Sequence, residues 1–370
     1  MSPVAPLPVA VDLTHARLNR TGIGRYAAEL FPALQARKTL RAIPVAAVDR
    51  APHTSVRRIA EGLLREGVYY PVGLANLARR SGAHVIHAPT PAAIISGRLP
   101  LVVTVMDLLP LRHPELFTHQ TRAHTALHRH FVRHAQQIIT PSEATRHDVI
   151  DLLGVPEERV TAVALGVAAR FAPRDIDPER LREHFGIRAP YVLCVGTLEP
   201  RKNLATVLRA FRIAAAQMPD AQLVITGGRG WRNEAFEAEL GAASKEVRLT
   251  GFVTDDELAE LYAGAACFVF PSLAEGFGFP PLEAMACGAP VVTSDRSALP
   301  EVTGNAALLV DPEDAEAVAG AIVEVLVNSS LAADLRRRGL ERSARFTWAA
   351  TAMATESVYR DAVAGAGGGK

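Results

Sequence analysis

The chain has 370 residues, 49% of them hydrophobic, and a formal net charge of +1 at pH 7. This composition excludes a largely disordered protein and provides material for two domains, each with a hydrophobic core of its own. The near-neutral charge conceals an uneven distribution, because about three fifths of the Lys and Arg residues and all twelve histidines precede residue 189. The basic first half and the acidic second half therefore indicate two different partners.

The start of the chain and its apolar segments indicate where the protein resides. Residues 1–6 lack the basic start of a secretory signal, and no apolar run approaches the ~20 residues that span a bilayer. Cys194, Cys267 and Cys287 form no CxxC pair and lie within or beside apolar runs, so we expect three small buried side chains. We predict a cytoplasmic protein and leave open a peripheral contact with the cytoplasmic face of the membrane.

Strand-like and helix-like segments alternate through the first half. We expect helices at 24–38 and 143–153, and strands at 7–12, 42–48, 84–87, 101–105 and 137–140. Such alternation predicts a parallel sheet with helices packed on it. The polar, proline-bearing stretch 172–178 then marks a boundary. We predict a first Rossmann-like domain at residues 1–170 and a linker at 171–188.

The alternation restarts in the second half. Strands are expected at 191–195, 222–226, 247–250, 267–270, 290–293 and 306–310, and Thr254 with Glu257 forms a capping box that begins a helix. A second Rossmann-like domain is therefore predicted at residues 189–345. Open α/β sheets bind ligands outside the carboxyl ends of their strands, so we expect the active site in a cleft between the two α/β domains.

Glu275 and Glu283 lie in the most informative segment of the chain. The strand-like run 267–270 leads through Gly276 and Gly278, which permit a tight turn, into Pro280-Pro281, which suits a first helical turn. Free N–H groups at a helix start bind phosphate, and carboxylates accept hydrogen bonds from sugar hydroxyls. The segment therefore predicts a site for a nucleotide-activated sugar.

Five segments of the second half resemble the retaining glycosyltransferases of family 4. They occur in the family's order and spacing at 195–203, 226–228, 249–253, 271–283 and 298–301, and the likeness extends from about Tyr191 to Trp348. The resemblance implies the GT-B fold, which consists of two doubly wound Rossmann-like domains facing an interdomain cleft. It also implies a retaining, metal-independent hexosyltransferase that needs no cofactor besides its nucleotide-sugar co-substrate.

The resemblance assigns roles to the residues of these segments. Glu283 would hold the ribose hydroxyls, Glu275 the hydroxyls of the transferred sugar, and the basic loop residues the donor diphosphate. Many relatives carry an arginine directly after the strand's glycine, whereas Thr197 follows Gly196 here. Arg201 is therefore expected to provide more of the positive charge that holds the diphosphate. The implied donor contacts in this half are Gly196, Arg201, Lys202, Phe252, Glu275, Gly276, Phe277, Gly278 and Glu283.

Two segments of the first half complete the predicted site. Thr21-Gly22-Ile-Gly24 resembles the loop that the family places beside the donor phosphate and the acceptor, although a tight turn without ligand contact is the alternative. Relatives commonly carry His-Asp where this chain has Met106-Asp107. Asp107 either binds acceptor or donor hydroxyls, and is then counted with Glu275, Arg201 and Lys202 as catalytic, or caps its loop.

Histidines gather between residues 113 and 134, and the pairs His124/His128 and His130/His134 stand four residues apart, as neighbours on a helix do. No glutamate accompanies them in the HExxH manner, so we predict no metal site and favour either a solvated helix or a basic face toward an anionic acceptor or membrane. The segment from Arg57-Arg58 to Arg79-Arg80 mixes basic and apolar residues and could lie on a bilayer surface.

The leading hypothesis is a glycosyltransferase of cell-surface polysaccharide assembly, such as lipopolysaccharide or exopolysaccharide, that moves a hexose onto a glycan or lipid-diphosphate-linked acceptor. Mannose from GDP-mannose is the favoured donor, with a UDP-sugar or a GDP-deoxysugar as alternatives, and no nucleic acid is expected as a partner. A final helix at 346–364 would cross back to the first domain, with Trp348 as its anchor. A GT-B epimerase, a glycan phosphorylase and a catalytically inactive binding subunit remain as other hypotheses.

Overall fold

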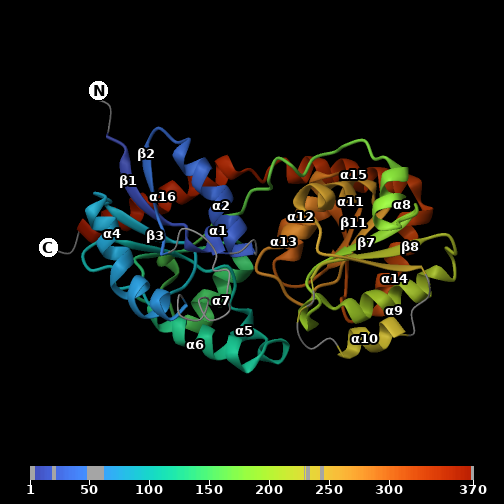
Figure 1. The fold of residues 1–370 in the computed structure, drawn as a ribbon, viewed down its shortest axis with the longest axis horizontal. Helices are drawn as coiled ribbons and strands as arrows, with labels where there is room; N and C mark the ends of the chain where they lie inside the picture. Colours follow the sequence, from blue (N-terminus) through green and yellow to red (C-terminus); the bar gives the residue numbers. More distant parts are fainter. Residues whose placement is uncertain are drawn as a thin grey trace. The chain divides into compact units, whose positions relative to one another are not determined.

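The computed structural model describes residues 5–18, 22–47, 62–228, 230, 234–241 and 246–367 (Figure 1). Thr21 and the Arg57-Arg58 pair, which entered the sequence argument, lie outside these residues. The chain divides into two compact units. Unit 1 comprises residues 1–166 and 347–370, and unit 2 comprises residues 167–346.

Unit 1 contains a six-stranded sheet whose neighbouring strands are all parallel. Its spatial order is β2-β1-β3-β4-β5-β6, from the strands β1 (Leu7–Asp12), β2 (Leu40–Val45), β3 (Val85–Ala88), β4 (Leu101–Thr104), β5 (Gln137–Thr140) and β6 (Val160–Ala162). The helical elements are α1 (Thr14–Leu18), α2 (Gly22–Gln35), the π-helical η1 (Arg65–Gly73), α4 (Leu74–Arg80), α5 (Leu109–Arg112), the 3-10 turns η2 (Pro114–Leu116) and η3 (Glu157–Arg159), α6 (His119–Val132), α7 (Glu143–Leu153) and α16 (Trp348–Gly367).

Unit 2 contains a second six-stranded parallel sheet. Its order is β12-β11-β10-β7-β8-β9, from β7 (Tyr191–Val195), β8 (Gln222–Thr226), β9 (Val247–Gly251), β10 (Cys267–Phe270), β11 (Val291–Ser294) and β12 (Ala307–Val310). Its helical elements are α8 (Pro178–Phe185), η4 (Pro200–Lys202), α9 (Leu204–Ala215), α10 (Glu234–Gly241), α11 (Asp255–Gly264), α12 (Phe279–Ala286), α13 (Leu299–Thr303), η5 (Gly304–Ala306), α14 (Ala315–Val327) and α15 (Ser329–Ser343).

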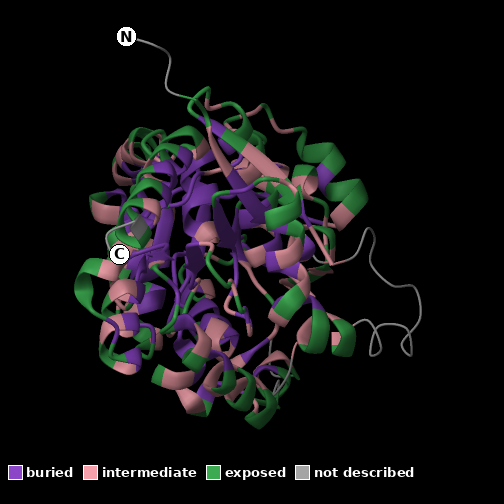
Figure 2. Ribbon diagram, turned by 90° about the vertical axis from the view of Figure 1, so that its left-hand side faces the viewer, coloured by how far each residue is buried: buried purple, intermediate pink, exposed green. Residues whose placement is uncertain are grey.

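The inner strands of both sheets are hydrophobic runs without polar alternation, as expected where helices cover both faces of a sheet. Every residue of β3, β4, β8, β10 and β11 is buried, and Figure 2 shows the buried residues concentrated on the strands and on the helix sides that face them. The predicted α/β class with two doubly wound sheets is confirmed. The three cysteines are free and buried, as predicted, and burial raises the pKa of each thiol to about 12.

Local sequence signals fix several helix ends. Ser142 caps α7 by accepting a hydrogen bond from the backbone N–H of Thr145, and Gly154 ends the helix in the left-handed conformation. Thr254 and Glu257 form the predicted capping box at the start of α11. These polar contacts satisfy backbone N–H groups that have no partner within their own helix.

The last helix belongs to unit 1. Glu356 of α16 pairs with Arg37 and accepts a hydrogen bond from the Thr39 hydroxyl at 2.8 Å, and the Tyr359 hydroxyl lies 2.7 Å from His87 Nδ1 on β3. The Trp348 ring contacts Tyr26 with ring centroids 6.2 Å apart. The C-terminal helix therefore packs on the first Rossmann-like sheet, and the half-buried Trp348 contacts Tyr26 of that unit.

The segment expected as a linker is part of unit 2. Arg170 pairs with Asp255 at 2.7 Å and Arg180 with Glu260 at 3.2 Å, while Leu181 of α8 is buried. The chain therefore leaves unit 1 after residue 166, earlier than the expected boundary at 170, because these ion pairs and the apolar face of α8 attach residues 167–188 to α11.

No single helix in the described part of the chain is both long and apolar enough to cross a membrane. A bent combination of α14 with residues Ser329–Ala366, which turns by 98°, passes the same test of length and composition.

Candidate functional site

The order of strands in unit 2 reverses between β7 and β10. These two strands are neighbours, and the chain continues from β7 outward through β8 and β9, whereas β11 and β12 extend the sheet beyond β10. Ligands of open α/β sheets bind outside the carboxyl ends of the strands at such a reversal. The segments after β7 and after β10, residues 196–203 and 271–278, are therefore where a ligand site is expected.

The segment after β7 has a close packing that requires glycine. A Cβ atom on Gly227 would lie 2.0 Å from the carbonyl oxygen of Gly196, and one on Gly196 would lie 3.2 Å from the Lys202 side chain. Asn203 adopts the left-handed conformation, with φ 57°, between η4 and α9. This turn brings Arg201 and Lys202 to the carboxyl end of the sheet.

The segment after β10 is held against the first one by hydrogen bonds to backbone carbonyl groups. The carbonyl oxygen of Arg201 accepts bonds from Leu273 N–H at 2.9 Å and from the Ser272 hydroxyl at 3.0 Å. The Asn203 side-chain amide donates to the carbonyl oxygen of Pro271 at 3.1 Å. Gly278, with φ 108°, then starts α12, whose first turn contains the prolines that the sequence predicted there.

Four charged side chains meet where the two segments touch. Arg201 lies 2.6 Å from Glu199 Oε1 and 2.5 Å from Glu275 Oε2, and Lys202 Nζ lies 2.6 Å from Glu275 Oε1. We call Glu199, Arg201, Lys202 and Glu275 the charged cluster. The exposed fraction of each side chain is 17% or less, so charges that are costly to bury are paired with one another.

The pKa of Glu275 shows how the charges are balanced. Burial alone would raise it, but Arg201 and Lys202 outweigh that effect and lower the pKa to about 2. Burial, and after it the charge of Arg201, lowers the pKa of Lys202. Glu275 is therefore an anion at neutral pH, and two cations and two anions share a region from which water is largely excluded.

The Glu275 side chain and backbone are both fixed. Ser272 donates to Glu275 Oε1 at 2.8 Å. Ser297 donates to the Glu275 carbonyl oxygen at 2.6 Å and accepts from Glu275 N–H at 3.1 Å, and its own backbone is left-handed with φ 61°. A carboxylate held by these bonds is prearranged for a ligand.

Glu283 lies in the second turn of α12 and is 2% exposed. The Tyr262 hydroxyl donates to its Oε2 at 3.3 Å. The helix begins at Phe279, so Glu283 lies about one turn beyond its N-terminus. Glu283 is thus a buried carboxylate and receives little of the N-terminal dipole.

The remaining predicted donor contacts of unit 2 differ from one another in exposure. Phe252 follows the end of β9 and is 75% exposed, so its ring is open to a planar ligand. Gly276 and Phe277 are buried, and the Phe277 ring packs on Phe279 and Phe346 at centroid distances of 5.5 and 6.1 Å. The Phe277 side chain is therefore part of the core.

Gly22, Gly24 and Asp107 belong to unit 1. Gly22 is exposed and Gly24 is buried, and both lie in the first turn of α2 without left-handed backbone. Asp107 is exposed after β4, and its Oδ1 accepts a hydrogen bond from Leu109 N–H at 3.2 Å. The loop-capping contact considered in the sequence analysis is therefore present.

Three residues of the site were not assigned from the sequence. Glu199 completes the charged cluster, Asn203 joins the two segments, and Ser297 fixes Glu275. An asparagine directly after a short basic turn is a signal for left-handed backbone, which Asn tolerates. Glu199 and Ser297 carried no such signal, because their partners come from contacts formed only in the folded unit.

Comparisons with known proteins point to one family. A model described as Glycosyltransferase Family 4 matches residues 20–171, and one described as Glycosyl transferases group 1 matches residues 189–328. Together they cover most of both units.

Similar curated proteins include bacterial mannosyltransferases. The O-antigen chain mannosyltransferase B of Escherichia coli is 35% identical over 61% of this chain and 61% of its own length. The serotype-specific mannosyltransferase WbdA of Escherichia coli is 32% identical over 61% of this chain and 29% of its own length. The MMP α-(1→4)-mannosyltransferase of Mycolicibacterium hassiacum is 32% identical over 63% and 56%. The match thus spans about three fifths or less of each relative.

Solved structures share the fold. A sucrose-phosphate synthase from Thermosynechococcus elongatus has a TM-score of 0.73 at 21% identity, covering 97% of this chain and all of that one. HepE of Anabaena, solved with UDP and glucose, has a TM-score of 0.72 at 19% identity and covers 95% and 98%. At these identities the likeness establishes the arrangement of the elements.

Proposed function

Because the chain belongs to the family 4 glycosyltransferases and has the GT-B fold, we propose that it transfers a hexose from a nucleotide sugar onto a glycan or lipid-linked acceptor. Mannose from GDP-mannose is the favoured donor. The names of similar proteins support this choice, since mannosyltransferases of O-antigen chains are among them. The same names favour a role in assembling cell-surface polysaccharide.

The observation that carries the proposal is the charged cluster at the β7/β10 reversal. Arg201 and Lys202 are held within ion-pair distance of a single carboxylate, that of Glu275. A donor diphosphate would compete with this carboxylate for the two cations. The two cations would then neutralise the charge that develops as the nucleoside diphosphate departs, which is the task that a divalent metal serves in other transferases.

The surrounding residues suit the other parts of a donor. Glu275, displaced from the cations, would accept hydrogen bonds from sugar hydroxyls, and Glu283 is a buried carboxylate whose two oxygens suit the vicinal diol of a ribose. At the N-terminus of α12, Pro280 and Pro281 carry no N–H, so Gly278 and Phe279 would supply the backbone donors to a phosphate. The exposed ring of Phe252 offers a face for a base to stack on.

We infer a retaining, front-face reaction. The acceptor hydroxyl oxygen forms a bond to the anomeric carbon on the face from which the diphosphate leaves. The bond between that carbon and the phosphate oxygen breaks, its electron pair stays on the diphosphate, and the acceptor proton passes to a phosphate oxygen. Arg201 and Lys202 stabilise the departing charge, so no protein nucleophile is required. Gly22, Gly24 and Asp107 of unit 1 would contribute to donor and acceptor binding.

Unit 1 also supports a peripheral contact with the cytoplasmic face of a membrane. Leu63, Leu64, Val68 and Val72 are each more than half exposed. Arg79 and Arg80 follow them as exposed residues at the end of α4. Apolar side chains beside basic ones suit the surface of an anionic bilayer. Val68→Glu is expected to reduce co-sedimentation with vesicles that contain anionic lipid, and undiminished co-sedimentation would remove this part of the proposal.

A turnover assay with and without acceptor tests the function. The protein is incubated in EDTA with GDP-mannose or UDP-glucose, with octyl α-mannoside as the acceptor probe, and released nucleotide and glycoside products are measured. We expect acceptor-dependent release of GDP and a new α-linkage in the proton NMR spectrum. Conversion of the nucleotide sugar without acceptor would indicate an epimerase. Tight nucleotide binding without turnover of either donor would favour the inactive binding subunit.

A further inference from the structure

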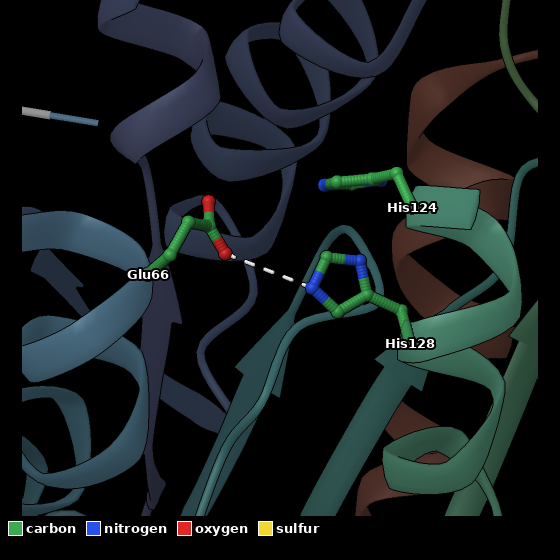
Figure 3. Close-up of side chains that lie close together, drawn as sticks. All are labelled: Glu66, His124 and His128. Carbon is green, nitrogen blue, oxygen red and sulfur yellow. Dashed lines mark ion pairs between the residues drawn. The ribbon is translucent and has the colours of Figure 1, made fainter. Parts of the chain in front are cut away.

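Unit 1 holds a group of potential metal ligands that includes two histidines of the segment at 113–134. Glu66 on η1 faces His124 and His128 on α6, and one ligand atom from each residue lies within 4.8 Å of the other two (Figure 3). Among the described residues this is the one set of three or more His, Cys, Asp or Glu side chains with such spacing. The histidines were predicted to form no metal site because no glutamate accompanies them in the HExxH manner, and the fold supplies one from another segment.

The backbone fixes the arrangement of all three side chains. His124 and His128 lie one helical turn apart, on the same side of α6, with ring centroids 4.1 Å apart and ring planes at 85°. Glu66 Oε2 lies 3.7 Å from His128 Nε2. Arg65 donates to the other oxygen, Oε1, at 3.0 Å, so the carboxylate is turned with Oε2 toward the histidines.

Two imidazoles and one carboxylate form a donor set that zinc and similar borderline divalent cations prefer. Metal bonds to these atoms are about 2.0–2.1 Å long, so the ligand atoms of a tetrahedral site lie about 3.4 Å apart. Small side-chain rotations would close the present separations to that value. His128 is buried and His124 is exposed, so the site has a fixed inner ligand and an outer position open to solvent.

We propose that Glu66, His124 and His128 bind one zinc-like divalent cation that joins η1 to α6. Water or one further side chain would complete the coordination. His15 on α1 is a further imidazole that interacts electrostatically with this region, since Arg65, Glu66 and His124 all influence its pKa. The site lies within unit 1, and its existence does not depend on the transferase activity.

The charges around the site both favour and oppose a cation. The Glu66 carboxylate faces the two histidines and attracts a cation. Arg65 places a positive charge beside Glu66 and weakens the attraction. A moderate affinity is therefore expected, below that of closed four-ligand zinc sites.

The end of α6 and the turn after it provide a matched control. His130 and His134 also stand four residues apart, with ring centroids 5.0 Å apart. Within the described residues no third His, Cys, Asp or Glu atom is near enough to complete a set with them. A metal that binds any exposed histidine pair would use both pairs, whereas the proposed site depends on Glu66.

Calorimetric titration with Zn²⁺ of the full chain, freed of any affinity tag, tests the proposal. We expect one saturable site with a dissociation constant in the micromolar range, weakened about tenfold or more by His124→Ala and by Glu66→Gln and unchanged by His130→Ala. His124 is exposed, so its variant should fold, and circular dichroism verifies this. Co²⁺ in place of Zn²⁺ should give a tetrahedral visible spectrum that His124→Ala abolishes.

Three results would overturn the site. Zn²⁺ could fail to bind saturably, it could bind equally well to His124→Ala and Glu66→Gln, or it could lose affinity equally in His130→Ala. In each case the three side chains form an ion pair and a ring contact only.

Discussion

Each unit contains a buried polar network, and the two networks differ in charge. In unit 1 the interior network is neutral: His87 Nε2 lies 2.9 Å from the Thr104 hydroxyl, which lies 3.0 Å from the Tyr26 hydroxyl, and the Tyr359 hydroxyl lies 2.7 Å from His87 Nδ1. Burial lowers the pKa of His87 to about 3, so its ring is uncharged at neutral pH. In unit 2 the corresponding region holds the charged cluster.

This difference separates a structural network from a candidate binding site. All hydrogen bonds of the neutral network lie within unit 1. The bond between Tyr359 and His87 attaches α16 to the sheet. The charged cluster could be replaced by apolar residues with little loss of stability, because buried ion pairs contribute little net stabilisation. Four clustered charges at a strand-order reversal are therefore better explained by a charged ligand than by folding.

The largest effect is expected from Lys202→Ala. It removes one of the two cations proposed to hold the donor diphosphate, and loss of a preorganised charge of this kind lowers turnover by about 100-fold to 1,000-fold. Arg209→Ala is the matched control, because Arg209 is an exposed cation on α9 of the same unit. Steady-state kinetics with GDP-mannose measure the turnover of both variants. An equal loss of turnover in the two would mean that Lys202 acts only through the net charge of unit 2.

Glu275→Gln should lower turnover by about 100-fold and also change the acid stability of unit 2. The folded pKa of Glu275, about 2, lies below its ordinary value of 4.5, so its carboxylate contributes stability that is complete above pH 4.5 and is lost as the pH falls toward 2. The variant should therefore lose less stability than the wild type over that range in urea unfolding. Glu316→Gln, at an exposed position, is the control. Its free energy of unfolding should depend on pH as that of the wild type does.

Much of the fold was predictable from the sequence, and most of the site's supporting contacts were not. The strands β1, β5, β7, β8 and β10 have the predicted bounds because each is an apolar run with polar or turn-forming residues beside it. The π-helical η1 was not predicted, since its mixed apolar and basic residues show no clear period. Motifs named Arg201, Lys202 and Glu275, but Glu199, Ser297 and the meeting of Glu66 with His128 arise from tertiary contacts that no local pattern encodes.

Tyr359→Phe tests the neutral network in unit 1. It removes the hydroxyl group beside the buried His87 Nδ1 and should lower the free energy of unfolding by about 1–3 kcal/mol. Nucleotide affinity should stay at the wild-type value, since the change leaves the charged cluster intact. Urea denaturation and nucleotide titration of the same sample measure the two quantities. A loss of nucleotide affinity without a loss of stability would reverse the roles assigned to the two networks.

Glu199→Gln should have the smallest effect of these substitutions, and it should raise the affinity for nucleotide instead of lowering it. It keeps an oxygen acceptor for Arg201 but changes the net charge of the cluster from zero to +1. A nucleoside diphosphate should then bind roughly two-fold to five-fold more tightly, with a steeper dependence on salt. Glu239→Gln, which alters a carboxylate paired with Arg212 on the surface, should leave the affinity unchanged.

The most direct measurement for the central claim is a calorimetric titration with GDP and with UDP in the presence of EDTA, on the wild type and on the variants Lys202→Ala, Glu283→Ala and Arg209→Ala. We predict saturable binding of one nucleotide, GDP by preference, weakened by the first two substitutions and unaffected by the third. Failure of both nucleotides to bind, or binding that Lys202→Ala and Glu283→Ala leave unchanged, would contradict a donor site at the charged cluster.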